Sequence, residues 1–369
     1  MTTTLRVVFD PSAPATGPDL VVASRELAAG LVATAPSGCE VRAIVPSDAG
    51  DDTLADQGVA AADRLPVGSA AASALWRRGL RAGAGDGLIH SATLAAPLVR
   101  HDRVHDHDQT VVTLWDVRPW DDPDELPRAD AAWSRAMLRR AVRHADAVVV
   151  PTHELARRVA ELAPLGDRLR VIAGAPSDDL RVPTDEVGRR RELDLPDGYV
   201  LLAGSAAASD RLRTGLEAVV RSGRDTAVVV IDAPEGAEPA IVELAAAAGL
   251  PERRLHVRGH LGAPDRAAVM AGAVAYLAPA DSRAFPWRTL DALRLGLPIV
   301  AAESATHREL LLDGATFAAG DPGSLGDELA ATLSSTSTVE RLAVLAADRG
   351  RAFSWAGAAE RVWQLHAEL

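Results

Sequence analysis

The sequence predicts an α/β protein with two doubly wound parallel sheets. Short apolar runs alternate with longer amphipathic stretches along the chain, a pattern typical of βαβ units. The alternation fades over residues 175–198, which are rich in Pro, Asp and Arg, and then restarts. The 369 residues exceed one ordinary hydrophobic core. We therefore expect a first domain over 1–174, a linker over 175–198 and a second domain over 199–352.

Individual elements follow from the same alternation. In the first domain we expect strands at 5–10, 40–46, 87–91, 111–116, 147–151 and 169–173, and helices at 19–35, 70–82, 127–144 and 152–162. In the second we expect strands at 199–204, 226–232, 255–258, 274–278 and 298–301, and helices at 210–222, 239–248, 263–273, 287–295, 324–333, 339–352 and 354–369. Ligands of such sheets bind beyond the carboxyl ends of the strands. The loops to inspect therefore follow Asp10, Ser91, Asp116, Gly204 and Ala278.

Composition excludes several classes of function. The net charge of -12 argues against a nucleic-acid partner, which requires a basic face. Cys39 is the only cysteine, so an intrachain disulfide is excluded and a zinc site is not expected. The longest apolar run, 267–280, is too short to span a bilayer, and residues 1–10 do not resemble a signal peptide. These features predict a cytoplasmic protein. The chain has no lysine, so every fixed cationic role falls to arginine.

One segment carries a recognisable motif. Residues 279–310 read PADSRAFPWRTLDALRLGLPIVAAESATHREL and resemble the family 4 glycosyltransferases, retaining enzymes of the GT-B fold. That family has E-G-F-G-x-P-x-x-E-A-x-A-x-G-x-P-V-V here, followed by Pro-Glu. Segments 144–161, 167–178, 320–330 and 353–363 are similar to further family segments in the same order. The residues kept from the main motif are Phe285, Asp291, Ala292, Gly296, Pro298, Val300 and Glu309.

The family resemblance implies an architecture and an activity that the alternation of apolar runs and amphipathic stretches does not itself indicate. It implies two Rossmann-like domains facing across a cleft, with a C-terminal helix, 353–369, that crosses back to the first domain. It implies a nucleotide-diphosphate sugar as donor, no metal or other cofactor, and hexose transfer with retention of configuration. The implied acceptor is a cell-envelope glycan or a lipid-linked saccharide. Contact with the inner membrane face and a partner glycosyltransferase are also within this expectation.

The donor site has to neutralise a diphosphate, which calls for cations, free N–H groups and helix N-termini. Gly17 and Gly204 match family glycines that let the backbone approach phosphate. Ser205 stands where the family has Arg. The family's Lys position falls on Asp210, or on Arg211 if the loop is one residue longer. A carboxylate against phosphate is unfavourable, so Arg211 is preferred if the site works; as an alternative, Arg211 is only a solvated helix residue.

The loop 281–291 departs most from the family pattern. Arg283 replaces the Glu that holds the donor sugar, and could instead reach the diphosphate. Asp291 matches the Glu that holds the ribose. Pro286 replaces a glycine, and the helix N-terminus near Thr289 remains as a dipole donor beside Phe285. The predicted donor-binding residues are Gly17, Gly204, Ser205, Arg211, Phe285, Thr289 and Asp291.

The first domain supplies the other candidates. The stretch TLWDVRPW resembles the family's T-x-H-D-L-x-P, with Asp116 kept and the His replaced by Trp115. Trp115 either stacks on a sugar or packs in the core, and the sequence favours neither. Asp19 is expected to cap its helix, and His90 to be structural. The predicted catalytic residues are Asp116, Trp115 and Arg283.

Two remaining clusters have simpler interpretations. The segment His101–Asp108 looks like a metal site but is expected to be a solvated acidic loop. Trp355, Val362 and Trp363 are expected to dock the last helix through core contacts. Two functions therefore stay open: a retaining glycosyltransferase, and a non-catalytic relative that binds a ligand or partner. A different GT-B activity, such as epimerisation of a nucleotide sugar, is disfavoured by the family 4-like segments.

Overall fold

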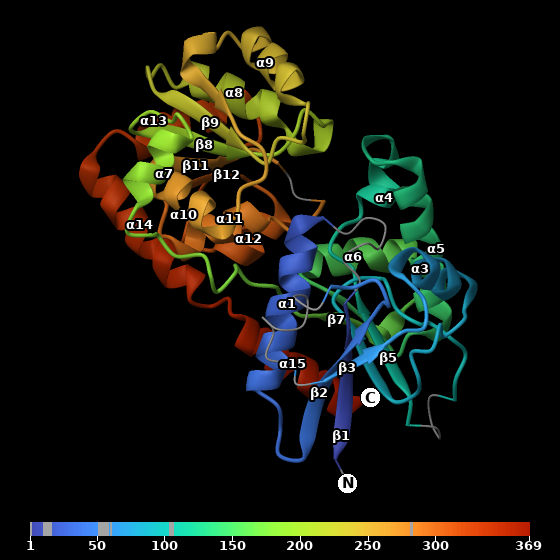
Figure 1. The fold of residues 1–369 in the computed structure, drawn as a ribbon. Helices are drawn as coiled ribbons and strands as arrows, with labels where there is room; N and C mark the ends of the chain where they lie inside the picture. The colour runs from blue at the N-terminus through green and yellow to red at the C-terminus, as the bar shows by residue number, and fades with distance from the viewer. Residues whose placement is uncertain (1, 10–16, 51–58, 60, 103–106, 281–282) are drawn as a thin grey trace. The chain divides into compact units, whose positions relative to one another are not determined.

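The computed structural model describes residues 2–9, 17–50, 59, 61–102, 107–280 and 283–369. The chain divides into two compact units (Figure 1). The first unit is Met1–Ala175 together with Phe353–Leu369, and the second is Pro176–Ala352. The C-terminal segment therefore belongs to the unit that contains the N-terminus.

The first unit is built on a parallel sheet in the order β3-β2-β1-β4-β5-β6-β7. Its strands are β1 (Thr3–Val8), β2 (Cys39–Val45), β3 (Ala62–Arg64), β4 (Leu88–Ser91), β5 (Gln109–Thr113), β6 (Ala147–Val150) and β7 (Leu169–Val171). Its helices are α1 (Pro18–Ala33), α3 (Ser69–Arg78), α4 (Arg118–Asp121), α5 (Arg128–His144), α6 (His153–Leu162) and α15 (Trp355–Glu368).

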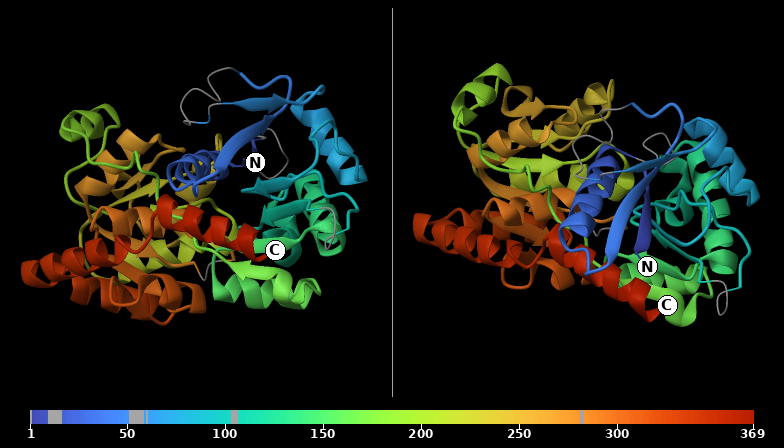
Figure 2. Two further views of the ribbon diagram at one scale, coloured as in Figure 1. Left: turned by 90° about the horizontal axis from the view of Figure 1, so that it is seen from below. Right: turned by 60° about the horizontal axis from the view of Figure 1, so that its bottom comes forward.

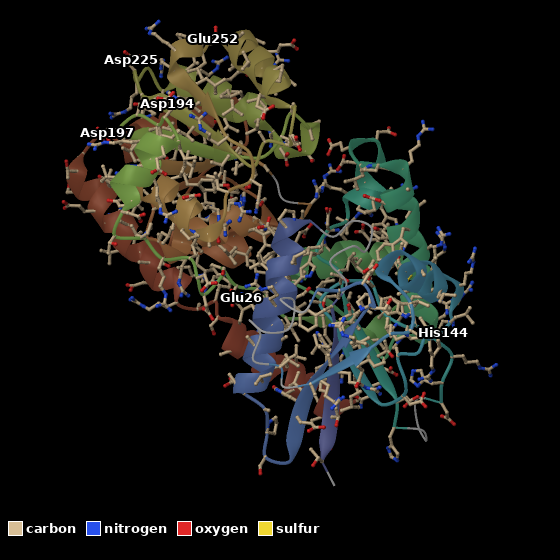
Figure 3. The ribbon with its side chains drawn as sticks, viewed as in Figure 1. Glu26, His144, Asp194, Asp197, Asp225 and Glu252 are labelled. Carbon is tan, nitrogen blue, oxygen red and sulfur yellow. The ribbon has the colours of Figure 1, made fainter. Side chains whose placement is uncertain are left out.

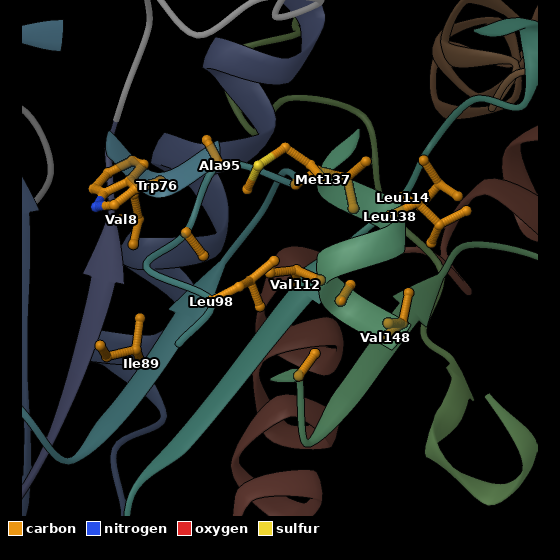
Figure 4. Close-up of a cluster of buried hydrophobic side chains, with 14 of the residues drawn as sticks. Val8, Trp76, Ile89, Ala95, Leu98, Val112, Leu114, Met137, Leu138 and Val148 are labelled. Carbon is orange, nitrogen blue, oxygen red and sulfur yellow. The ribbon is translucent and has the colours of Figure 1, made fainter. Parts of the chain in front are cut away.

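Apolar strand residues and helix faces form the core of this unit. Val8, Ile89, Val112 and Val148, on four strands of the sheet, contribute to one buried cluster. Met137 and the other inward residues of α5 pack on that sheet (Figure 4). Because these strands are covered on both faces, their sequences read as continuous apolar runs, as expected for buried parallel strands.

Helix α15 packs closely along α1 (Figure 2). A Cβ on Gly30 of α1 would lie 2.7 Å from the carbonyl oxygen of Trp355, so the approach depends on glycine. The indole of Trp363 donates a hydrogen bond to the Leu31 carbonyl at 3.1 Å. Trp355, Val362 and Trp363 are all buried, which confirms the prediction that they dock the last helix.

A buried histidine pair also links α15 to the sheet. His366 Nδ1 lies 2.8 Å from Gln109 Oε1, and His366 Nε2 lies 3.3 Å from His90 Nδ1. Because the amide oxygen accepts, His366 carries its proton on Nδ1 and accepts from His90 Nδ1–H. His90 Nε2 is then a buried acceptor without a partner among the described residues. His90 is structural, as the sequence predicted.

This pair predicts a loss of stability in acid. Burial, and secondarily the neighbouring His366, lower the pKa of His90 well below its usual value; burial lowers the pKa of His366 to about 4. The unfolded chain therefore binds protons first. The contribution of the two neutral histidines to the free energy of unfolding should be fully present above about pH 6.5. Towards pH 4 the free energy of unfolding should fall by about 1.4 kcal/mol per pH unit for each histidine.

Denaturant unfolding between pH 4 and pH 8 measures this slope. A His90→Leu/His366→Met variant should lose the slope, whereas replacing exposed His153 with Gln should leave it unchanged. An equal slope in the double variant would show that other groups cause the acid sensitivity.

The second unit repeats the doubly wound plan in the order β10-β9-β8-β11-β12-β13, all parallel. Its strands are β8 (Tyr199–Ala203), β9 (Ala227–Ile231), β10 (Leu255–Val257), β11 (Ala273–Ala278), β12 (Ile299–Ala302) and β13 (Thr316–Ala318). Its helices are α7 (Glu186–Glu192), α8 (Leu212–Arg221), α9 (Glu238–Ala247), α10 (Ala263–Gly272), α11 (Trp287–Arg294), α12 (Ala305–Leu311), α13 (Pro322–Thr332) and α14 (Thr336–Gly350).

The differences from the sequence prediction involve short elements. Strands β3 and β13 and helices α4, α7 and α12 have three to seven residues and were not expected, because so short an element shows little periodicity. The equally short strands β7 and β10 were expected, at 169–173 and 255–258. Helix α7 lies in the segment expected to be a linker and packs against α10. No helix in the described part of the chain is long and apolar enough to cross a membrane.

Candidate functional site

The strand order of the second unit defines where a ligand would bind. The chain winds outward from β8 in one direction through β9 and β10, and in the other through β11, β12 and β13. The loops that leave β8 and β11 therefore diverge and open a crevice at the carboxyl edge of the sheet. Residues 204–211 follow β8, and of the residues after β11 the structure describes 279–280 and 283–286. Most of the predicted donor residues lie on these two segments or at the start of α11.

The loop after β8 is closed by a carboxylate. Gly204 has φ +128°, and a Cβ there would lie 3.0 Å from Asp210. Asp210 Oδ2 accepts the Ser205 backbone N–H at 2.7 Å and the Ser205 hydroxyl at 2.6 Å. The donors that a phosphate would use at this strand end therefore already serve the protein's own carboxylate.

Arg211 lies beside this loop but points across the sheet edge. It adopts φ 50° and donates from Nη2 to the carbonyl of Gly320, which follows β13. Arg211 as a whole is half-buried. Arg213, two residues further along, is exposed and pairs with Glu217 at 3.0 Å. A phosphate role for Arg211 stays a prediction, and it requires donors other than the one bound to Gly320.

Asp291, the predicted ribose ligand, is part of a buried charge network. Its Oδ2 accepts from Arg288 Nη1 at 2.7 Å, and Arg266 Nε lies 2.9 Å from the same oxygen. All three side chains are at least nine-tenths buried. Helix α11 places Arg288 and Asp291 three residues apart on one face, and α10 supplies Arg266. The carboxylate is therefore engaged by two guanidiniums rather than presented at the surface.

Asp232 and His260 extend this network to the surface. Asp232 follows β9 with φ 62°, and its Oδ2 accepts from Arg288 Nε. Its Oδ1 lies 3.1 Å from Nδ1 of the exposed His260, which follows β10. Burial opposes ionisation of Asp232, but the hydrogen bond from His260 and the charge of Arg288 outweigh it and lower the pKa to about 2. Asp232 is therefore ionised at neutral pH.

The remaining candidates of this unit differ in exposure. Arg283 is exposed on the loop that leaves β11. Phe285 is 4% exposed, and its ring packs edge-on against Trp287 with centroids 4.7 Å apart. Thr289 is buried in the first turn of α11. Of the cationic candidates, Arg283 is the one placed at the surface of the crevice loop.

In the first unit, Trp115 packs inside the protein. It is 6% exposed, and its indole N–H donates to the Ala92 carbonyl at 2.7 Å. Asp116 accepts the backbone N–H and the Nε–H of Arg118, both at 2.7 Å, so it stabilises the start of α4. This burial supports the packing interpretation of Trp115 over stacking on a sugar.

A substitution separates these two interpretations of Trp115. Trp115→Phe retains most of the buried ring and leaves the Ala92 carbonyl without its donor, so unfolding free energy should fall by about 1–3 kcal/mol. Ligand affinity should stay within twofold, measured by calorimetry. A tenfold loss of affinity without loss of stability would restore the sugar-stacking role.

The other sequence candidates of the first unit are at the start of α1 and in the acidic segment. Gly17 is the N-cap of α1, and Asp19 lies in the first turn; the expectation that Asp19 caps the helix is therefore wrong. Residues 10–16 and 103–106 lie outside the described residues. His101 pairs with buried Asp146 at 3.2 Å, so it is not a solvated residue as expected. Among the described residues, no group of three or more His, Cys, Asp or Glu is arranged to hold a metal.

Asp232, His260 and Arg288 were not among the residues predicted from the sequence. Asp232 was the last residue of an expected strand, and His260 follows another by two residues. The rule that ligands bind at carboxyl ends of strands would have identified both. Arg288 gave no signal, because nothing in the sequence indicates that it reaches back to Asp232.

One family model and several solved structures are similar to this chain. Residues 198–335 match the family model described as "Glycosyl transferases group 1". Sucrose-phosphate synthase from Thermosynechococcus elongatus superposes with a TM-score of 0.70 at 16% identity, covering 99% of this chain and 98% of that chain. Anabaena HepE, in complex with UDP and glucose, gives 0.70 at 16% identity, covering all of both chains. WaaG, a glycosyltransferase involved in lipopolysaccharide biosynthesis, gives 0.64 at 16% identity, covering 97% and 98%.

These likenesses establish the fold. The chain consists of two parallel-sheet, Rossmann-like α/β domains of the GT-B type. No curated protein sequence matches the chain significantly. The matched family region spans β8 to α13, so it contains the whole sheet of the second unit and its crevice loops.

Proposed function

We propose that the chain is a glycosyltransferase that binds a nucleotide-diphosphate sugar at the carboxyl edge of the second sheet. The observation behind this proposal is the group 1 glycosyltransferase match, which covers both crevice loops. The fold shared with HepE, whose structure contains UDP and glucose, is consistent with it. In this account the diphosphate lies between the ends of β8 and β11.

The finer assignment follows the family resemblance. Arg283 approaches the diphosphate, the N-terminal turn of α11 adds its dipole, and Ser205 donates once Asp210 moves aside. A hexose is transferred with retention and without a metal, to a cell-envelope glycan or lipid-linked saccharide. Asp116 fixes the start of α4 on the acceptor side. Because Asp291 is held by Arg266 and Arg288, ribose recognition passes in this account to Asp232 and His260 at the surface of the same network.

Calorimetry with UDP-, GDP- and ADP-sugars tests the proposal. Binding of one donor, with slow release of free sugar seen by NMR, is the expected result, and EDTA should not reduce it. Arg283→Ala should weaken donor binding at least tenfold, because a charge-assisted contact to phosphate is lost. The control is Arg253→Ala, which removes an exposed arginine that is distant in the sequence from Arg283. Unchanged affinity in Arg283→Ala would remove Arg283 from the site.

The loop after β8 also favours a second function, that of a non-catalytic binding protein. The Asp210 carboxylate occupies the N–H and hydroxyl of Ser205, so this strand end is satisfied without an anion. Such a protein would bind no member of the donor panel, or would bind a donor without releasing sugar. A donor that binds and turns over excludes this alternative.

A further inference from the structure

The side chain of His260 is anchored at the carboxyl edge of the second sheet. Its Nδ1 lies 3.1 Å from Asp232 Oδ1, and Asp232 Oδ2 accepts from Arg288 Nε on helix α11. Asp232 and His260 follow β9 and β10. Figure 3 labels Asp225 and Glu252, which precede the same two strands at the opposite edge of the sheet. The imidazole is therefore tied, through one carboxylate, to the helix that begins the candidate site.

The backbone beside His260 is held by the same network. Arg288 also donates to Asp291, and Arg266 Nε lies 2.9 Å from the same carboxylate oxygen. Arg266 Nη1 donates to the carbonyl of Leu261, the residue after His260, at 2.8 Å. The contacts thus form a closed ring that starts at the imidazole and returns to the backbone next to it. Because three side chains of the ring are at least nine-tenths buried, it leaves the imidazole little freedom to turn.

The ring also determines which nitrogen of His260 carries the proton. Asp232 is ionised at neutral pH, so its carboxylate can only accept hydrogen bonds. The neutral imidazole therefore carries its proton on Nδ1 and has a lone pair on Nε2. The side chain is 42% exposed, and Nε2 has no hydrogen-bond partner within the described part of the chain. Nε2 is thus an acceptor that an O–H or N–H group of a ligand can satisfy.

We propose that His260 Nε2 accepts a hydrogen bond from a ribose hydroxyl of the nucleotide, and that Asp232 is the residue that positions it. This inference rests on the nucleotide site proposed above and names the atom that reads the ribose. Strand β9 lies next to β8, and neighbouring strands are about 4.8 Å apart. The ribose is the first group after the diphosphate, so on the β8 side it extends over the ends of β9 and β10. A nucleotide that lacks the hydroxyl should therefore bind less tightly.

Calorimetry with deoxy analogues tests the role of His260. The ligands are the diphosphate that binds among UDP, GDP and ADP, and its 2′-deoxy and 3′-deoxy analogues. The wild-type protein should bind the parent nucleotide about 3- to 10-fold more tightly than one of the analogues, as expected for one neutral hydrogen bond. In His260→Asn the amide still pairs with Asp232 but does not reach the position of Nε2, so this preference should disappear. The control, His107→Asn, replaces an exposed histidine of the first unit and should keep the preference.

Asp232→Asn tests the positioning role separately. Asn suits the φ of 62° at this position, and its amide oxygen can still accept from Arg288. The amide N–H then donates to His260 Nδ1, which moves the imidazole proton to Nε2 and turns the acceptor into a donor. Nitrogen-15 NMR at pH 8 should show the proton on Nδ1 in the wild-type protein and on Nε2 in Asp232→Asn. The preference for the ribonucleotide should be lost with the change of tautomer, an effect that a merely structural Asp232 would not have.

Three results would overturn the inference: a proton on Nε2 of His260 in the wild-type protein, equal binding of the parent nucleotide and both deoxy analogues, or an unchanged preference in His260→Asn. The last two do not require Asp232→Asn to fold. Failure of the proposed function is a different result, because none of the three nucleotides would then bind the wild-type protein, and this inference would fail with it. Binding without discrimination refutes the role of His260 alone.

Discussion

Replacing Asp291 with alanine should lower the free energy of unfolding by about 3–5 kcal/mol. The substitution leaves Arg266 and Arg288 buried while removing the carboxylate oxygen that both approach, and breaking a buried ion pair from one side typically costs this much. Chemical denaturation at pH 7 measures the change. If Asp291 instead served mainly to hold a ribose, donor affinity would fall while stability stayed nearly constant.

Two further variants make this prediction specific. Asp225→Ala removes a carboxylate that is 85% exposed and 3.4 Å from Arg254 Nε, and should cost less than about 0.5 kcal/mol. Arg266→Met combined with Asp291→Leu should recover much of the loss, because apolar replacement of a buried pair is often neutral. A double variant as unstable as Asp291→Ala would show that the cost arises from packing rather than from unpaired charge.

Replacing Asp210 with asparagine should strengthen nucleotide-diphosphate binding about 10- to 100-fold. The substitution removes a negative charge from the Ser205 donors without changing the size of the side chain. A unit charge about 4 Å from a phosphate costs about 4 kcal/mol at an effective dielectric constant of 20, and part of that cost should be recovered. Calorimetric titration with UDP and GDP measures the gain. Weaker binding in the variant would instead make Asp210 a ligand-contacting residue.

The first unit offers a matched control for this change. Asp48 accepts the backbone N–H and the hydroxyl of Ser69, both at 2.9 Å, and so repeats the Asp210–Ser205 arrangement. Asp48→Asn should change the free energy of unfolding only slightly, as Asp210→Asn should. It should have no effect on nucleotide affinity. A gain of affinity in both variants would point to a general reduction of negative charge rather than to the loop after β8.

The fold was largely predictable because the spacing of apolar residues along the chain reflects which residues are buried. Strands such as β8 and β9 are apolar throughout, since helices cover both faces of their sheet, and they were expected within a residue or two. Short elements were missed for the opposite reason. Strand β13 has three residues, and its pairing with β12 is a long-range property that a local pattern does not contain.

The site was less predictable, because its charged side chains pair with residues that are distant in the sequence. The motif alignment identified the positions of Asp291 and Arg283. It could not show that Arg288 and Arg266 neutralise Asp291, since those side chains lie on two helices. The preference for Arg211 assumed that a carboxylate would avoid this strand end. The structure places Asp210 there, because local N–H and hydroxyl donors satisfy it.

Hydrogen–deuterium exchange with and without UDP, GDP or ADP tests most directly where a nucleotide binds. With the nucleotide that binds, protection should appear in peptides covering 204–211 and 283–291, the loops at the ends of β8 and β11. Peptides of the first sheet should change little. Protection confined to other segments, or no protection with any of the three nucleotides at saturating concentration, would contradict the donor site proposed here.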